Sequence, residues 1–136
     1  MKIDHIAIWT NNLEGLKDFY VRYFEGTAGN KYINEEKHFQ SYFVTFDSGA
    51  RIELMKKTGI PDNLNDRSGK QHTGIIHIAF GALSKAEVDK KAVTLREAGY
   101  KILSGPRVTG DGYYEFETLD PDDNRIEVTF PLGRDE

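Results

Sequence analysis

The strongest constraint on the fold is an internal repeat. His5-Ile6-Ala7 returns as His77-Ile78-Ala79, and Arg51-Ile52-Glu53-Leu54 returns as Arg125-Ile126-Glu127-Val128. Each half of the chain therefore carries one His near its start and one Glu near its end. A half of about 65 residues buries too little surface to be stable alone. We therefore expect the two halves to pack together, or to exchange with a second chain.

The first half predicts the order of elements in the repeated module. Residues 3–10 read as a strand, Thr10-Asn11-Asn12 can cap a helix, and apolar residues at helical spacing extend that helix over 13–24, where Gly26 is expected to end it. The polar stretch 31–38 predicts a strand and a loop. Residues 38–46 and 51–55 predict two strands joined by a turn over 47–50. The module is thus strand, helix, strand, strand, strand.

The second half predicts the same order. A strand over 75–80 leads to a helix that opens with Ser84-Lys85-Ala86-Glu87, a capping-box sequence, and stops at Gly99. Strands follow over 100–103, 113–119 and 125–130, with turns at Gly105-Pro106 and 120–124. Pro131 is expected to end the last strand and residues 132–136 to form a frayed tail. We predict an α+β fold of two tandem βαβββ modules, 1–55 and 75–131, joined by a connector over 56–74 into one domain, 1–136.

Composition narrows the function. The 136 residues contain no Cys, which excludes disulfides, thiolate zinc sites, iron–sulfur clusters and a Cys nucleophile, so any metal must be held by N and O ligands. The net charge of −4 and the lack of a basic patch argue against nucleic acid or an anionic membrane as a partner. The N-terminus enters a strand at once, and no apolar run reaches the roughly 18–20 residues of a membrane helix. A cytoplasmic location is therefore expected.

Side-chain alternation places the repeated His and Glu residues. The apolar neighbours of His5, Glu53, His77 and Glu127 should face the helices, so these four side chains should lie on the other face of their sheets. Two His and two Glu in symmetric positions predict a site for one divalent metal. Singly, each residue also has a simpler interpretation: a surface His, half of an exposed ion pair, or a relic of duplication without chemistry.

The same motifs resemble the vicinal oxygen chelate superfamily, which groups glyoxalase I, bleomycin- and fosfomycin-resistance proteins, methylmalonyl-CoA epimerase and extradiol dioxygenases. The resemblance covers nearly all of residues 2–130. It rests on Asp4-His5-Ile6-Ala7-Ile8, on Asp18-Phe19-Tyr20, on Ile76-His77-Ile78-Ala79-Phe80 and on the run from Leu119-Asp120-Pro121 to Glu127. It implies paired βαβββ modules whose mixed sheets curl around a metal cavity. It also implies a homodimer, with modules paired within one chain or exchanged between two.

Within this superfamily the set of two His and two Glu resembles glyoxalase I most closely. Fosfomycin-resistance enzymes and extradiol dioxygenases use three ligands, the epimerase usually has Gln at the position of Glu53, and bleomycin-type binders need no metal. The resemblance implies a glyoxalase-like isomerase or lyase for a small substrate with vicinal oxygens. Zn or Ni is the preferred metal, with Co, Mn and Fe also compatible. It implies a metal-stabilised enediolate, with Glu127 as the base and Glu53 as the second choice.

The substrate contacts are less sharply defined. Glyoxalase I has an Arg where this chain has Trp9, so the pocket should be more apolar, and a glutathione-linked substrate does not follow from the resemblance. Tyr113, Tyr114 and Arg107 are further candidates for substrate contact. Which tyrosine faces the cavity is left open, because Glu115 and Glu117 do not fit a simple alternation. Two alternatives remain: a small-molecule binding or antibiotic-resistance-type protein, and an Fe(II) dioxygenase, which the three-ligand pattern of that branch opposes.

Overall fold

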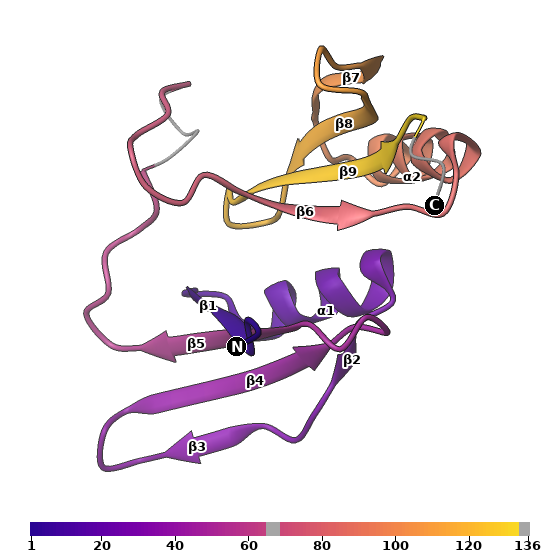
Figure 1. Ribbon diagram of the computed structural model, residues 1–136. Coiled ribbons are helices and arrows are strands. Elements are labelled where there is room, and N and C mark those ends of the chain that lie inside the picture. The colour runs from indigo at the N-terminus through magenta and orange to yellow at the C-terminus, as the bar shows by residue number, and fades with distance from the viewer. Residues whose placement is uncertain (65–68, 134–136) are drawn as a thin grey trace. The chain divides into compact units, whose positions relative to one another are not determined.

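The computed structural model describes residues 1–64 and 69–133. The chain divides into two compact units, residues 1–63 and 64–136, and each unit contains one sheet and one long helix (Figure 1). Both sheets mix parallel and antiparallel strands. The predicted α+β class and the tandem βαβββ arrangement are confirmed.

Unit 1 is a five-stranded sheet with helix α1 (Leu13–Phe24). Its strands are β1 (His5–Trp9), β2 (Thr27–Ala28), β3 (Tyr32–Asn34), β4 (Phe39–Thr45) and β5 (Arg51–Lys57). The order is β1-β5-β4-β2, and β3 also pairs with β4, so two short strands stand where one was expected. β1 runs parallel to β5, and the other pairs are antiparallel.

Helix α1 packs its apolar side on the sheet. Its buried residues meet buried residues of β4 and β5 to form the core of unit 1: Leu13, Leu16, Phe19, Tyr20, Phe24, Val44, Ile52 and Leu54. Asn12 caps the helix, because its side-chain oxygen accepts from the Gly15 N–H at 3.1 Å.

Helix α1 ends at Phe24, as predicted, but Gly26 is not the left-handed residue that follows it. The left-handed residue is Glu25, at φ 54. Gly26 is there for space instead, because a Cβ at this position would lie 2.4 Å from Cγ1 of Val44. A left-handed glycine and a glycine under close packing look the same in sequence.

Unit 2 is a four-stranded sheet with helix α2 (Lys85–Glu97). Its strands are β6 (His77–Gly81), β7 (Ile102–Val108), β8 (Tyr113–Leu119) and β9 (Arg125–Pro131), in the order β6-β9-β8-β7. The core lies between α2 and the sheet and contains Val88, Ala92, Leu95, Phe116, Ile126 and Val128. Ser84 caps α2 through the Glu87 N–H at 3.1 Å, and the Glu87 carboxylate accepts from the Leu83 N–H.

Two strand boundaries were predicted wrongly in unit 2. The expected turn at Gly105-Pro106 lies inside β7, which is an edge strand where a Pro without an N–H is tolerated. The register of β7 against β8 shifts on both sides of Ser104, and the Gly105–Pro106 peptide is cis. β9 ends at Pro131 and so includes this proline, one residue beyond the predicted strand 125–130. Residues 134–136 of the expected tail, and 65–68 of the expected connector, lie outside the described residues.

The turn between β8 and β9 is built by one carboxylate. Oδ1 of Asp120 accepts from the backbone N–H of Asp122 and of Asn124, both at 2.9 Å, and Oδ2 accepts from Nδ2 of Asn124 at 2.8 Å. Asp120 is buried. The Asp-Pro-x-x-Asn motif is therefore a structural element that sets where β9 begins.

Residues 1–64 and 69–133 contain no helix that could span a membrane. Neither α1 nor α2 has the length and apolar character that crossing a bilayer requires, and no other described helix does.

Candidate metal half-sites

In unit 1 the alternation of side chains agrees with the sequence analysis. Ile52 and Leu54 of β5 are buried under α1, and Glu53 points to the other face. On the neighbouring β1, His5 lies on that same face. Nε2 of His5 is 3.4 Å from Oε2 of Glu53. We call this pair half-site 1.

Unit 2 repeats the arrangement. Ile126 and Val128 of β9 are buried under α2, and Glu127 points away from the helix. Nε2 of His77 on β6 is 3.2 Å from Oε2 of Glu127. We call this pair half-site 2. The two histidine side chains are equally exposed, at 36%, and the glutamates are more covered, at 19% for Glu53 and 14% for Glu127.

These distances fit two ligands of one ion. An imidazole nitrogen and a carboxylate oxygen that each lie about 2.1 Å from a metal, at an angle of about 90–109°, are roughly 3.0–3.4 Å apart. Each half-site supplies one nitrogen and one oxygen, which is the donor set of an N/O metal site. Among the described residues no three His, Asp or Glu side chains are gathered closely enough to hold a metal.

At half-site 1, Asp4, the residue before β1, contacts both His5 and Arg51. Nδ1 of His5 lies 2.7 Å from Oδ2 of Asp4, and Nη2 of Arg51 donates to the same oxygen at 2.5 Å. Arg51 lies over the ring of Phe43 at 4.4 Å. Phe43 also meets His5 edge-on, with ring centroids 5.2 Å apart. The hydrogen bonds from His5 and then Arg51 hold the pKa of Asp4 below its ordinary value.

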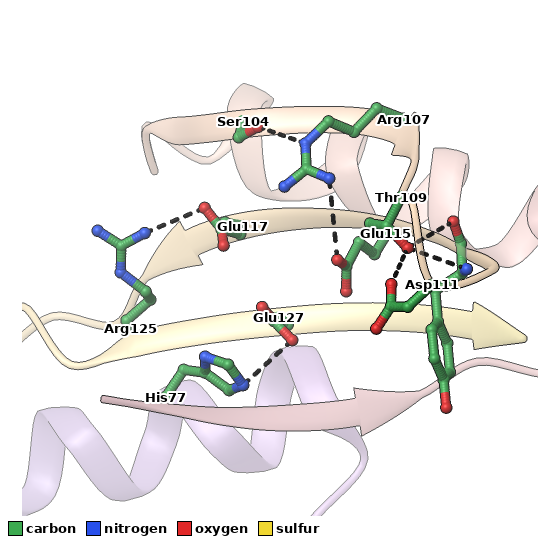
Figure 2. Close-up of polar contacts among 10 residues, drawn as sticks. His77, Ser104, Arg107, Thr109, Asp111, Glu115, Glu117, Arg125 and Glu127 are labelled. Atoms are coloured by element: carbon green, nitrogen blue, oxygen red, sulfur yellow. Dashed lines mark hydrogen bonds and ion pairs between the residues drawn. The ribbon is translucent and has the colours of Figure 1, made fainter. Parts of the chain in front are cut away.

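Half-site 2 is surrounded by carboxylates. Glu117 of β8 lies directly across from Glu127 in the strand register, and Glu115 is the next residue on the same face. Each has an arginine partner: Arg125 donates to Glu117 at 3.0 Å, and Arg107 lies 3.9 Å from Glu115. Figure 2 shows these side chains together with His77 and Glu127 on one side of the sheet.

The surroundings of half-site 2 raise the pKa of Glu127. Burial raises the pKa of Glu127 above its ordinary value of 4.5, and the charges of Glu115 and Glu117 raise it further, as does a side-chain hydrogen bond with Glu117. His77 acts in the opposite direction. The net effect is a carboxyl that holds its proton to higher pH than a free Glu.

The two tyrosines left open by the sequence lie on opposite faces. Tyr113 shares the face of Glu115, Glu117 and Glu127, because all of them alternate in register along β8 and β9. Tyr114 lies on the helix side, where its hydroxyl donates to Oδ1 of Asp89 at 2.6 Å and Lys85 lies over its ring. Tyr114 is therefore placed away from the half-site.

Arg107 and Trp9, the other predicted substrate contacts, differ in their surroundings. Arg107 already has partners in its own unit, since its Nε–H donates to Ser104 Oγ at 2.8 Å in addition to its pairing with Glu115 (Figure 2). Trp9 lies on the His5 face of β1 and is 42% exposed. It meets Phe39 edge-on at 6.2 Å, so it offers apolar surface on the same face as half-site 1.

A groove of about 770 Å³ lies beside this aromatic pair. Its lining comes from the β3–β4 turn, the end of β5 and the segment before α1, and includes Phe39, Gln40, His38, Lys56, Lys57 and Asn11. None of the half-site residues lines it. Phe39, the neighbour of Trp9, lines the groove, and so does Lys57, which lies on the same face of β5 as Glu53.

Sequence reasoning missed three residues at the half-sites. The sequence motif contains Asp4 but does not predict its contact with the ring of His5. Glu115 and Glu117 do not break the alternation of β8, as the sequence suggests, but follow it and place charge beside Glu127. The signal was present: an acidic residue at every second position of a strand marks one face.

Comparison with known proteins supports the fold. The solved structures most informative here are a glyoxylase/bleomycin resistance protein/dioxygenase domain from Frankia sp. EAN1pec, the trypanothione-dependent glyoxalase I of Leishmania major and the lactoylglutathione lyase of Agrobacterium tumefaciens. Their TM-scores are 0.80, 0.73 and 0.69, with 15%, 19% and 21% identity. The alignments cover 96%, 94% and 95% of this chain and 98%, 85% and 92% of those chains. At such identities they show a shared fold.

Sequence comparison points the same way. The uncharacterized protein YqjT of Bacillus subtilis (strain 168) is 38% identical over 61 residues, which is 43% of this chain and 48% of YqjT, so the match spans about half of that relative. The Glyoxalase/Bleomycin resistance protein/Dioxygenase family matches residues 2–128. With nearly the whole chain matched and both βαβββ units in place, this chain belongs to the Glyoxalase/Bleomycin resistance protein/Dioxygenase superfamily.

Proposed function

We propose that this chain is a divalent-metal-dependent isomerase or lyase of the glyoxalase type, acting on a small substrate with two neighbouring oxygens. The observation that carries the proposal is the pair of half-sites. Each brings one His nitrogen within 3.4 or 3.2 Å of one Glu oxygen, at equivalent strand positions. Two unrelated surface pairs would not be expected to share strand, face, spacing and exposure.

His5, Glu53, His77 and Glu127 would together hold one divalent ion. Four N and O donors suit Zn, Ni, Co, Mn or Fe(II), and the family resemblance favours Zn or Ni. The two half-sites would come from the two units of one chain, or from two chains of a homodimer.

Glu127 is the proposed base. A bound metal would act as a Lewis acid toward the two substrate oxygens, which makes the neighbouring C–H more acidic. The Glu127 carboxylate would take that proton and return it to the adjacent carbon, while the hydroxyl proton passes from the first oxygen to the second, so that the carbonyl moves by one position. Glu117 lies across the strand pair from Glu127, in position to share its proton. Glu53 is the second candidate, with fewer acidic neighbours.

Trp9 and Tyr113 are the proposed substrate contacts on the half-site faces. Trp9 offers an apolar surface that would exclude water from one side of the substrate, and Tyr113 offers a hydroxyl on the face of Glu127. Tyr114 and Arg107 are weaker candidates for substrate contact, since each already has a partner within unit 2.

The test is metal analysis combined with proton exchange. Purified protein should contain stoichiometric divalent metal, and Glu53→Ala should lower that content. In D₂O the metal-loaded protein should exchange the C–H beside the carbonyl of a 2-hydroxy carbonyl compound or a hemithioacetal, measured by proton NMR. Glu14→Ala, an exposed carboxylate on α1, is the matched control. Protein that carries no metal, with Glu53→Ala unchanged from wild type, refutes the proposal.

A second candidate is a small-molecule binding protein of the same fold. The exposed Trp9, its contact with Phe39 and the adjacent groove favour it. Saturable quenching of Trp9 fluorescence by a ligand in metal-free protein, without any catalysed exchange in metal-loaded protein, would support binding over catalysis. Because Trp9 is the single Trp of the chain, the signal has one source.

A further inference from the structure

We propose that Asp4 is a positioning residue of half-site 1. It holds the ring of His5 in the tautomer with hydrogen on Nδ1, so that the lone pair of Nε2 faces Glu53. The relevance of this to metal binding rests on the proposed function, but the tautomer itself does not.

The first support is the direction of the hydrogen bond. Oδ2 of Asp4 lies 2.7 Å from Nδ1 of His5. A carboxylate that also receives a hydrogen bond from Arg51 can only accept, so Nδ1 must carry the hydrogen. In a neutral imidazole the other nitrogen, Nε2, is then unprotonated.

The second support is how firmly Asp4 itself is held. Arg51 donates from Nη2 to the same carboxylate oxygen at 2.5 Å, and its guanidinium lies over the ring of Phe43. Phe43 meets the ring of His5 at an angle of 85°. His5 is therefore fixed at its Nδ1 edge by Asp4 and on another side by Phe43, and Asp4 cannot swing away without breaking an ion pair.

As a consequence, two hydrogen-bond acceptors, Nε2 of His5 and Oε2 of Glu53, lie next to each other. With Nδ1 protonated, Nε2 of His5 and Oε2 of Glu53 face each other at 3.4 Å, each with a lone pair and no hydrogen between them. This arrangement is unfavourable unless a cation or an added proton lies between the two atoms. Asp4 thus prepares half-site 1 for a positive ion before the ion arrives, which is the role that outer carboxylates play at metal-bound histidines.

In half-site 2, the residue before the histidine is not an acid. The residue before His77 is Ile76, whose side chain accepts no hydrogen bond. Among the described residues, the side-chain partner of His77 is Glu127 at Nε2. The contrast makes His77 an internal reference for any effect on His5.

The test is ¹⁵N NMR of the two ring nitrogens in metal-free full-length protein, at about pH 8.5, above the ordinary histidine range. We expect His5 of the wild type to be mainly the Nδ1–H tautomer. In Asp4→Ala it should shift toward the Nε2–H tautomer. Asp4→Asn keeps an acceptor oxygen without the charge and should lie between the two. His77 should keep its signals in both variants, and Glu14→Ala should leave His5 unchanged.

Metal affinity is the second measurement. Loss of an outer-shell partner typically weakens metal binding about 10–100-fold, so Asp4→Ala should raise the Kd for Zn²⁺ by that factor, and Asp4→Asn by less. An unchanged His5 tautomer in Asp4→Ala overturns the inference. A shifted tautomer with a Kd within about twofold of wild type removes its role in metal binding. If wild-type protein binds no Zn²⁺, the proposed function fails while the tautomer measurement still decides the role of Asp4.

Discussion

Across the strand pair from its glutamate, half-site 1 has Phe43 and half-site 2 has Glu117. The neighbouring arginines follow this difference. Arg51 lies over the Phe43 ring and reaches Asp4, whereas Arg125 donates to Glu117. One position on a neighbouring strand therefore changes the environment of the glutamate from aromatic to acidic, although the strand pairing, the face and the His–Glu distance stay nearly the same.

The difference suggests a division of roles between the two copies. In half-site 1 the histidine is the residue held by its neighbours, through Asp4 and Phe43. In half-site 2 the glutamate is the residue that its neighbours perturb, because Glu115 and Glu117 favour its protonated form. On the proposed function, the first copy positions the ion and the second handles the proton.

The largest expected effect is on catalysis by Glu127. Glu127→Gln should lower kcat about 10²–10⁴-fold, the usual contribution of a general base, and Glu53→Gln should lower it less at equal metal occupancy. The measurement is kcat for both variants with bound metal quantified in the same samples. Equal losses, or a larger loss for Glu53→Gln, would reverse the proposed division of roles.

The next effect compares the cores of the two units. Phe116 faces Val128 and is 1% exposed, so Phe116→Ala should cost about 3–5 kcal/mol of the free energy of unfolding. Tyr42 faces Leu54 at the equivalent place, is only half-buried and has its hydroxyl on Glu14. Tyr42→Ala should therefore cost less, about 1–2 kcal/mol. Urea unfolding of both variants checks this, and equal costs would mean that the two strand pairs are packed alike.

A smaller effect concerns the pKa of Glu127 in metal-free protein. Glu117→Gln removes one of the acidic neighbours, so the pKa of Glu127 should fall toward 4.5 without reaching it, because burial remains. A carboxyl with a raised folded-state pKa favours the folded state at low pH, and that contribution is lost as pH rises through the raised value. Glu117→Gln should therefore make the free energy of unfolding fall less as pH rises through the pKa of Glu127. Side-chain ¹³C NMR titration of Glu127 measures the shift, and an upward shift would contradict it.

The smallest effect separates the two tyrosines. Tyr114→Phe should leave the KM of any substrate within about twofold of wild type, since its hydroxyl lies on the helix side with Asp89. Tyr113→Phe should raise KM about two- to tenfold if its hydroxyl binds substrate, the usual value of one hydrogen bond. Steady-state kinetics of both variants checks this. A larger change in KM for Tyr114→Phe than for Tyr113→Phe would mean that substrate binds on the α2 side of the sheet, which contradicts the proposed site.

Much of the fold could be predicted because its signals lie within short segments of the sequence and occur in both halves of the chain. The repeat, the alternation on β1 and β5, and the Asn12 and Ser84 caps each depend on residues close in sequence. The split into β2 and β3 and the continuation of β7 through Gly105-Pro106 depend on pairing with β4 and β8. Such pairings lie far apart along the chain, and local propensity does not report them.

The half-sites show the same limit at the level of side chains. Alternation was enough to place His5 and Glu53 on one face, because period two is a property of any strand. It could not show that Asp4 turns back to the ring of His5, or that Glu117 lies across from Glu127. The first depends on a rotamer at the start of a strand, and the second on the register between β8 and β9.

That register depends on a residue that belongs to neither half-site. The carboxylate of Asp120 satisfies three donors and fixes the length of the turn before β9. A slip of β9 by one residue would invert its two faces, sending Ile126 and Val128 into solvent and Glu127 beneath α2. Because the same strand carries both kinds of residue, one turn governs both the packing under α2 and the place of Glu127 beside His77.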